Sequence, residues 1–134
     1  MNINWYPGHM KKTIESIQSV KSQCDLAIVL LDARIPMSSY NPLLDDTFAN
    51  YPVLYLLNKS DLADPAVTDA WIEYFKGREE TSAIPWTATG KANMRALSKA
   101  IEDLAAPIRE KERAKGMQKR KLRVMVTGLS LIHI

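Results

Sequence analysis

The sequence predicts an α/β fold, with helices on both faces of a doubly wound parallel sheet of about four strands. Two short runs, 25–31 and 53–57, are apolar almost throughout, which is typical of strands buried on both faces of a parallel sheet. Segments with apolar residues at helical spacing separate these runs from each other and from two weaker strand candidates. This alternation favours right-handed crossovers that place helices on both faces.

The first half of the chain divides into loop, helix and strand segments. An early Pro-Gly pair predicts a loop over residues 1–9, and apolar residues at helical spacing predict a helix over about 10–22. The strand at 25–31 runs into a loop rich in proline and serine. A short helix at about 42–49 then leads to the strand at 53–57.

The second half begins with the helix start Asp64-Pro65, a capping residue followed by proline. We expect this helix to end before Gly77 and to bury Val67, Trp71 and Phe75. A weaker strand follows at 82–86, where Pro85 favours an edge position.

The last two elements are a helix and a strand. Asn93 is expected to cap the helix, which extends as far as Arg113. Its apolar stripe consists of Met94, Leu97, Ile101 and Leu104. The strand at 122–127 ends at Gly128.

The composition is that of a globular domain. The 134 residues are 46 % hydrophobic and 25 % charged, which is enough for one domain with a core. No apolar run is as long as a membrane span, and the first residues do not resemble a signal peptide. Cys24 is the only cysteine, so we expect no disulfide partner and a cytoplasmic location.

The net charge of +3 is unevenly distributed. Residues 109–123 contain eight basic and two acidic residues, so the remainder of the chain is slightly acidic. Such a basic segment either contacts a polyanion or is a solvated connector, and its charge alone leaves both possibilities open.

Asn58-Lys59-Ser60-Asp61 follows the strand at 53–57, at the strand end where open α/β sheets bind ligands. The carboxylate of Asp61 can accept hydrogen bonds from the ring N–H and exocyclic amine of guanine together. Adenine would leave this carboxylate unpaired, so the motif favours a guanine site. Asn58 can offer its amide to the other base edge or hold neighbouring loops together, and the stem of Lys59 can cover the base. The alternative is an ordinary polar loop before the next helix.

The next strand ends in Thr87-Ala88-Thr89, small residues suited to a backbone N–H contact from Ala88 to the carbonyl oxygen of guanine. Nothing before Asn58 resembles the phosphate loop Gly-x-x-x-x-Gly-Lys-Ser/Thr. Gly128 is the only candidate for the start of such a loop. A chain that contacts guanine first and phosphate last is circularly permuted.

Four motifs in this order resemble the YlqF/RbgA family of circularly permuted ribosome-biogenesis GTPases. The fold that the resemblance implies is part of a circularly permuted P-loop GTPase G domain. The matching stretches are Trp5-Tyr6-Pro7-Gly8-His9-Met10, residues 32–39 with Asn41-Pro42, Leu57-Asn58-Lys59-Ser60-Asp61, and Ala114-Lys115-Gly116 before the strand into Gly128.

The resemblance implies a GTPase that uses GTP or GDP with Mg²⁺ and assists assembly of the large ribosomal subunit. Its partners would be the precursor of that subunit and its rRNA, with the basic segment 109–123 on rRNA phosphates. His9 matches the histidine that positions the hydrolytic water. Nucleotide contacts are expected from Asn58, Lys59, Asp61, Thr87, Ala88 and Gly128, and no protein metal ligand is assigned.

The resemblance stops after residue 129. A phosphate loop from Gly128 would place a second glycine at His133 and a lysine at Ile134. We therefore expect an amino-terminal loop and helix (1–24), a partial G domain (25–128) and a non-matching tail (129–134). We also expect a truncated GTPase, which binds guanine nucleotides weakly or not at all and does not hydrolyse GTP.

Two other functions compete with the GTPase hypothesis. The first is a non-catalytic RNA-binding or ribosome-binding module that uses the basic segment 109–123. The second is a flavodoxin-like regulatory domain with Asp32 as acceptor and Lys59 as its partner. This second hypothesis requires two acidic residues together after an early strand, and no such pair follows Leu31.

Overall fold

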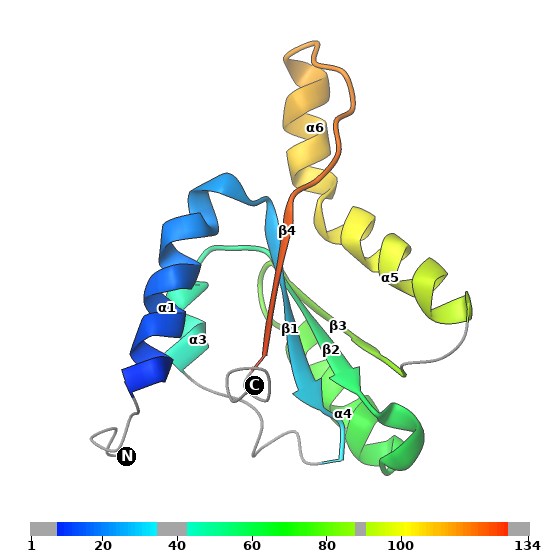
Figure 1. Ribbon diagram of the computed structural model, residues 1–134. Helices are drawn as coiled ribbons and strands as arrows, with labels where there is room; N and C mark the ends of the chain where they lie inside the picture. Colours follow the sequence, from blue (N-terminus) through cyan, green and yellow to red (C-terminus); the bar gives the residue numbers. More distant parts are fainter. Residues whose placement is uncertain (1–7, 35–42, 88–90, 129–134) are drawn as a thin grey trace.

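The computed structural model describes residues 8–34, 43–87 and 91–128, and in these ranges it forms one parallel sheet flanked by helices (Figure 1). The predicted site residue Ala88 and the predicted tail 129–134 lie outside the described residues. The elements in chain order are α1 (Gly8–Val20), the 3-10 turn η1 (Lys21–Gln23), β1 (Leu26–Asp32), α3 (Leu43–Thr47), β2 (Val53–Asn58), the 3-10 turn η2 (Ser60–Leu62), α4 (Pro65–Lys76), β3 (Thr81–Pro85), α5 (Lys91–Leu104), α6 (Ala106–Ala114) and β4 (Val124–Gly128).

The four strands are hydrogen-bonded in the order β3-β2-β1-β4, and every neighbouring pair is parallel. The central strands β1 and β2 are the two apolar runs of the sequence, and they pair from Ala27 with Val53 to Asp32 with Asn58. Strand β3 lies at an edge, as Pro85 predicts, since proline has no N–H to donate to a further strand. The predicted α/β class with a parallel sheet is confirmed.

Helices pack on both faces of the sheet, so side chains of β2 alternate between two cores. Val53, Tyr55 and Leu57 face a core that includes residues of α1 and α4. Leu54 and Leu56 face a second core against α5. All five side chains are buried, which explains why the run contains no polar residue before Asn58. None of the helices in the described ranges is long and apolar enough to cross a membrane.

The first helix begins at Gly8, so the prediction of a loop through residue 9 was wrong. The N–H groups of a helix's first turn need no acceptor within the helix, and a Pro-Gly pair can therefore lead directly into one. The helix ends at Val20 and continues as the 3-10 turn η1. Gly8 and His9 thus belong to the first turn of α1, where only the backbone is described.

The buried face of α4 includes Phe75, as predicted, and Trp71 packs against the core while partly exposed, but the prediction for Val67 was wrong. Thr68, Ile72 and Phe75 are buried, whereas 43 % of Val67 is exposed. Asp64 caps the helix by accepting a hydrogen bond from the N–H of Ala66, as its sequence predicts. The spacing of Val67 and Trp71 fits a helical stripe equally well, so periodicity alone could not select the stripe that meets the sheet.

The predicted helix from Asn93 to Arg113 is two helices, α5 and α6, which meet at the buried Ala105. Pro107 lies in the first turn of α6, where its missing N–H needs no acceptor. It would interrupt the hydrogen bonding of one continuous helix, so the chain bends here. Met94 is 59 % exposed and lies outside the core. The other three residues of the predicted stripe, Leu97, Ile101 and Leu104, pack against the second core.

Beyond the bend, α6 stands away from the sheet and the following segment returns beside it into β4 (Figure 1). An ion-pair network fastens this unit to the start of β1. Arg120 donates to both carboxylate oxygens of Asp25, at 2.8 and 2.9 Å, and contacts Glu112 at 2.7 Å. The hydrogen bond from Arg120 lowers the pKa of Asp25 below its ordinary value of 3.8, although burial opposes this shift.

Replacing Phe75 with alanine should lower the free energy of unfolding by about 3–5 kcal/mol. Phe75 is fully buried and stacks on Tyr55 with ring centroids 4.0 Å apart, so truncation leaves a cavity. The matched control on the same helix is Val67→Ala, which should cost about 0.5 kcal/mol because Val67 is exposed. Urea denaturation measures both, and equal losses would show that the face of α4 is wrongly assigned.

Asp25→Asn should destabilise the protein by about 1–3 kcal/mol at neutral pH, because Arg120 loses a charged partner. The folded-state pKa of Asp25 is lowered, so its contribution is present above about pH 4 and is lost as the pH falls through the folded pKa. The stability difference between wild type and variant should therefore shrink on acidification. The exposed pair Lys99–Asp103 is the control, since Asp103→Asn should have little effect at any pH. A constant Asp25 difference down to about pH 2 would contradict this account.

Candidate functional site at the carboxyl edge of the sheet

The carboxyl ends of β1 and β2 lie side by side and carry the polar residues predicted from the sequence. Asp32 and Asn58 are direct neighbours in the parallel register. The N–H of Ala33 donates to the carbonyl oxygen of Asn58 at 2.7 Å, so pairing continues one residue beyond β1. The two loops therefore leave the sheet at the same level, the position at which open α/β sheets bind ligands.

Lys59 turns the chain from β2 into η2 with an unusual backbone. Its φ of 61° and ψ of 34° lie in the left-handed region, which costs a residue with a side chain about 1 kcal/mol. The turn is closed by the N–H of Leu62, which donates to the carbonyl oxygen of Lys59 at 3.0 Å. Asp61 lies within this turn and is exposed at the sheet edge.

Ser60 connects this loop to the loop after β3. Its N–H and its hydroxyl both donate to the carbonyl oxygen of Trp86, each at 3.1 Å. The N–H of Trp86 donates in turn to the carbonyl oxygen of Leu57 at 2.9 Å, which extends the pairing of β3 with β2. The loop that contains Asp61 and the loop that contains Thr87 are thus held together. The role of Ser60 was not predicted, because nothing local in the sequence indicates a partner 26 residues away.

Asn93 holds Thr87 in place and does not cap α5, so the predicted role of Asn93 was wrong. The helix begins two residues earlier, at Lys91. The side-chain amide of Asn93 donates to the carbonyl oxygen and the hydroxyl of Thr87, at 2.7 and 2.8 Å. An asparagine near a helix start can bond its own helix or the preceding loop, and here it bonds the loop.

Asp32 stabilises its own loop through Arg34. The guanidinium of Arg34 donates to both carboxylate oxygens, at 3.0 and 2.7 Å, and its backbone N–H donates at 3.0 Å. The Arg34 hydrogen bond holds the pKa of Asp32 below its usual range, although burial opposes it. The ammonium nitrogen of Lys59 lies 4.0 Å from Oδ2 of Asp32. The carboxylate is occupied by Arg34, which counts against the flavodoxin-like hypothesis of Asp32 as a phosphoryl acceptor.

The structure brings four predicted site residues to one edge: Asn58, Lys59, Asp61 and Thr87. Gly128 is the last residue of β4 and pairs with Leu30, so β1 separates it from the other four. His9 lies in the first turn of α1, and its side chain is outside the described residues, as is the whole of Ala88. Within the described ranges, no cluster of three His, Cys, Asp or Glu side chains could hold a metal ion.

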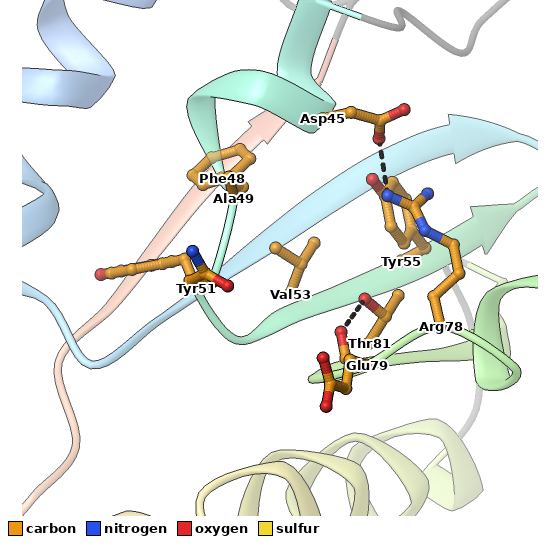
Figure 2. Close-up of a pocket in the computed structure, with 10 residues that line it drawn as sticks. Asp45, Phe48, Ala49, Tyr51, Val53, Tyr55, Arg78, Glu79 and Thr81 are labelled. Carbon is orange, nitrogen blue, oxygen red and sulfur yellow. Dashed lines mark hydrogen bonds and ion pairs between the residues drawn. The ribbon is translucent and has the colours of Figure 1, made fainter.

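Figure 2 shows a small polar pocket of about 80 Å³ at the opposite end of the sheet. Its walls include Val53 and Thr81, the first residues of β2 and β3. Asp45 and Arg78 close one side with an ion pair at 2.9 Å. Burial raises the pKa of Tyr55, beside this pair, to about 12. None of the residues predicted for the guanine site lines this pocket.

No family model matches the chain. Comparisons with individual known proteins do find relatives. Ribosome biogenesis GTPase A of Bacillus licheniformis is 38 % identical over 132 residues, which are 96 % of this chain and 45 % of that protein. The protein of the same name in Priestia megaterium is 37 % identical over 130 residues, again 96 % and 45 %. A solved structure of GNP-bound YlqF from T. maritima has a TM-score of 0.57 at 22 % identity, covering 87 % of this chain and 42 % of that one.

The described part of the chain therefore has the fold of part of a circularly permuted P-loop GTPase, since its structural neighbour YlqF is such a protein and matches over 42 % of its length. More particularly, the chain is a homologue of the ribosome biogenesis GTPase A proteins, and its resemblance to the YlqF/RbgA family is confirmed. The chain spans about 45 % of the length of these relatives.

Lys59→Gly should leave the free energy of unfolding unchanged or raise it by up to about 1 kcal/mol, because glycine adopts the left-handed backbone without strain. Asn50→Gly is the matched control, since Asn50 has a φ of 60° at a position remote from the site. Thermal denaturation of both variants measures the effect. A loss above about 1 kcal/mol for Lys59→Gly alone would assign its side chain a structural role through Asp32.

Proposed function

We propose that this chain is the guanine-nucleotide-binding part of a GTPase that assists assembly of the large ribosomal subunit. The observation that carries the proposal is the joined pair of loops at the carboxyl edge, with Asp61 exposed on one loop and Thr87 fixed on the other. The relatives named ribosome biogenesis GTPase A support the biological process.

The proposed base contacts follow from the chemistry of the edge residues. Asp61 accepts from the ring N–H and the amine of guanine, and its carboxylate has no ion pair among the described residues to compete. Asn58 donates to the other edge of the base, and the stem of Lys59 covers it. The loop of Thr87 and Ala88 supplies a backbone N–H for the guanine carbonyl oxygen.

We assign GTP hydrolysis to the whole protein and not to these 134 residues alone. They contain no Gly-x-x-x-x-Gly-Lys-Ser/Thr sequence. Gly128 would begin the phosphate loop, and Mg²⁺ would bind with the phosphates only in the full-length protein. His9 would position the attacking water from the first turn of α1. The partners would be the precursor of the large subunit and its rRNA, in the cytoplasm.

A second candidate function is a non-catalytic rRNA-binding module. The observation that favours it is the charge of residues 109–123, with eight basic and two acidic side chains. This function predicts RNA binding that weakens steeply with salt and does not respond to GTP. Binding of guanine nucleotides at Asp61 would reject it as the only function of the chain.

Asp61→Asn should shift the nucleotide preference from GDP towards xanthosine diphosphate by about 100-fold or more, because the amide donates where xanthine accepts. Competition against fluorescently labelled GDP, at high protein concentration, measures this preference. The control Asp69→Asn removes another exposed carboxylate, from α4, and should preserve the preference for GDP. An unchanged preference in Asp61→Asn would reject the role of Asp61 as the base-reading residue.

A further inference from the structure

The unit formed by residues 106–123, here called the α6 hairpin, carries the excess positive charge of the chain. It consists of α6 and the segment that returns to β4, and it projects from the amino-terminal end of the sheet (Figure 1). The N–H of Met117 donates to the carbonyl oxygen of Glu112 at 2.9 Å and closes its tip. Arg109 donates to the carbonyl oxygen of Arg120 and joins its two arms.

The three arginines of the α6 hairpin that point to carboxylates have structural roles. Arg120 holds Asp25 and Glu112, and Arg109 holds Glu102 at 3.1 Å. Glu112 is only 8 % exposed and contacts both Arg109 and Arg120, so this network joins the two arms of the hairpin from within. Arg113 pairs with Glu110 at 2.6 Å on the surface. Both acidic residues of the hairpin are thereby occupied by arginines.

The hairpin has four exposed lysines, and their partners differ from those of the arginines. The hydrogen bond from Arg109 lowers the pKa of Glu102, and the charge of Lys119 contributes to this shift. Lys111, Lys115 and Lys121 have no carboxylate partner among the residues that the structure describes. Lys111 and Lys115 are four residues apart and share one side of the helical arm. The side chain of Arg120 points towards Asp25, and Lys121 follows it in the returning arm. Three exposed lysines without a carboxylate partner therefore lie on a hairpin whose own acidic residues are paired with arginines.

We propose that the α6 hairpin binds the phosphate backbone of RNA through Lys111, Lys115 and Lys121. This inference rests on the proposed function, since it names the surface that would meet rRNA. Lysines bind phosphate as point charges without fixed geometry. Residues 106–123 contain no aromatic side chain on which a base could stack, so the contacts carry little sequence preference.

RNA fits this surface better than an anionic membrane. Met117 is the one large apolar side chain of the hairpin that is prominently exposed within the described residues, at 51 %. Membrane-bound helices of this kind bury a whole apolar face beside their basic residues, which one methionine does not provide. The hairpin and the carboxyl edge lie at opposite ends of the strands, so RNA and nucleotide can bind at the same time.

The test measures binding of the complete 134-residue chain to a fluorescein-labelled RNA stem-loop, by anisotropy, over a series of KCl concentrations. The variant replaces Lys111, Lys115 and Lys121 together with glutamine. The control replaces Lys12, Lys76 and Arg95 with glutamine, which removes the same charge from exposed positions on α1, α4 and α5. Circular dichroism confirms that both variants fold.

The hairpin variant should bind RNA at least about tenfold more weakly at low salt, and its log–log salt slope should fall by about 2–3, as expected for three lost phosphate contacts. The control should keep most of the wild-type slope. Arginine at the same three positions should restore binding, since the positive charge is what binds.

Equal losses in variant and control would overturn the proposal, because net charge alone would then explain binding. Weaker binding to phosphatidylserine vesicles with unchanged RNA binding would also overturn it and favour a membrane. Absence of RNA binding by the wild-type chain would overturn it as well. GDP competition on the same variant keeps the two proposals separate, since the hairpin variant should retain its nucleotide preference.

Discussion

The pairing of β1 with β2 is the constraint on which the rest of the structure depends. The two strands are buried on both faces, so each must be apolar throughout and must find helices on both sides of the sheet. Their register sets Asp32 beside Asn58 and brings two polar loops to one edge. A slip of one residue would exchange the two cores and separate the loops. Fold and candidate site therefore follow from the same register.

The strands, their parallel arrangement and the edge position of β3 were largely predictable, whereas helix faces and long-range polar contacts were not. Apolar runs such as 53–57 have few alternatives in an α/β chain, and Pro85 indicated the edge position correctly. The exposed Val67 fits a helical stripe as well as the buried Ile72 does, and only packing decides between them. Asn93 and Ser60 act through partners distant in sequence, which no local pattern contains.

The structure separates the basic residues of the segment 109–123 into two groups, arginines paired with carboxylates and exposed lysines, which the sequence alone does not distinguish. The charge of residues 109–123 alone fits either a polyanion-binding segment or a solvated connector. Arg109 and Arg120 anchor the hairpin through buried or half-buried carboxylates. The exposed lysines carry the excess charge at the end of the sheet opposite Asp61. Two chemically different surfaces are thus held at a fixed separation by one small sheet.

Mapping of GDP by amide chemical shifts in isotope-labelled protein tests the central claim most directly, because NMR detects even millimolar binding. The account predicts that GDP shifts the amides of residues 58–61 and 87–88, that ADP does so much more weakly, and that the α6 hairpin does not respond. Equal shifts from GDP and ADP, or shifts confined to the basic hairpin, would show phosphate binding without recognition of guanine. Either result would contradict a guanine site at the carboxyl edge of this sheet.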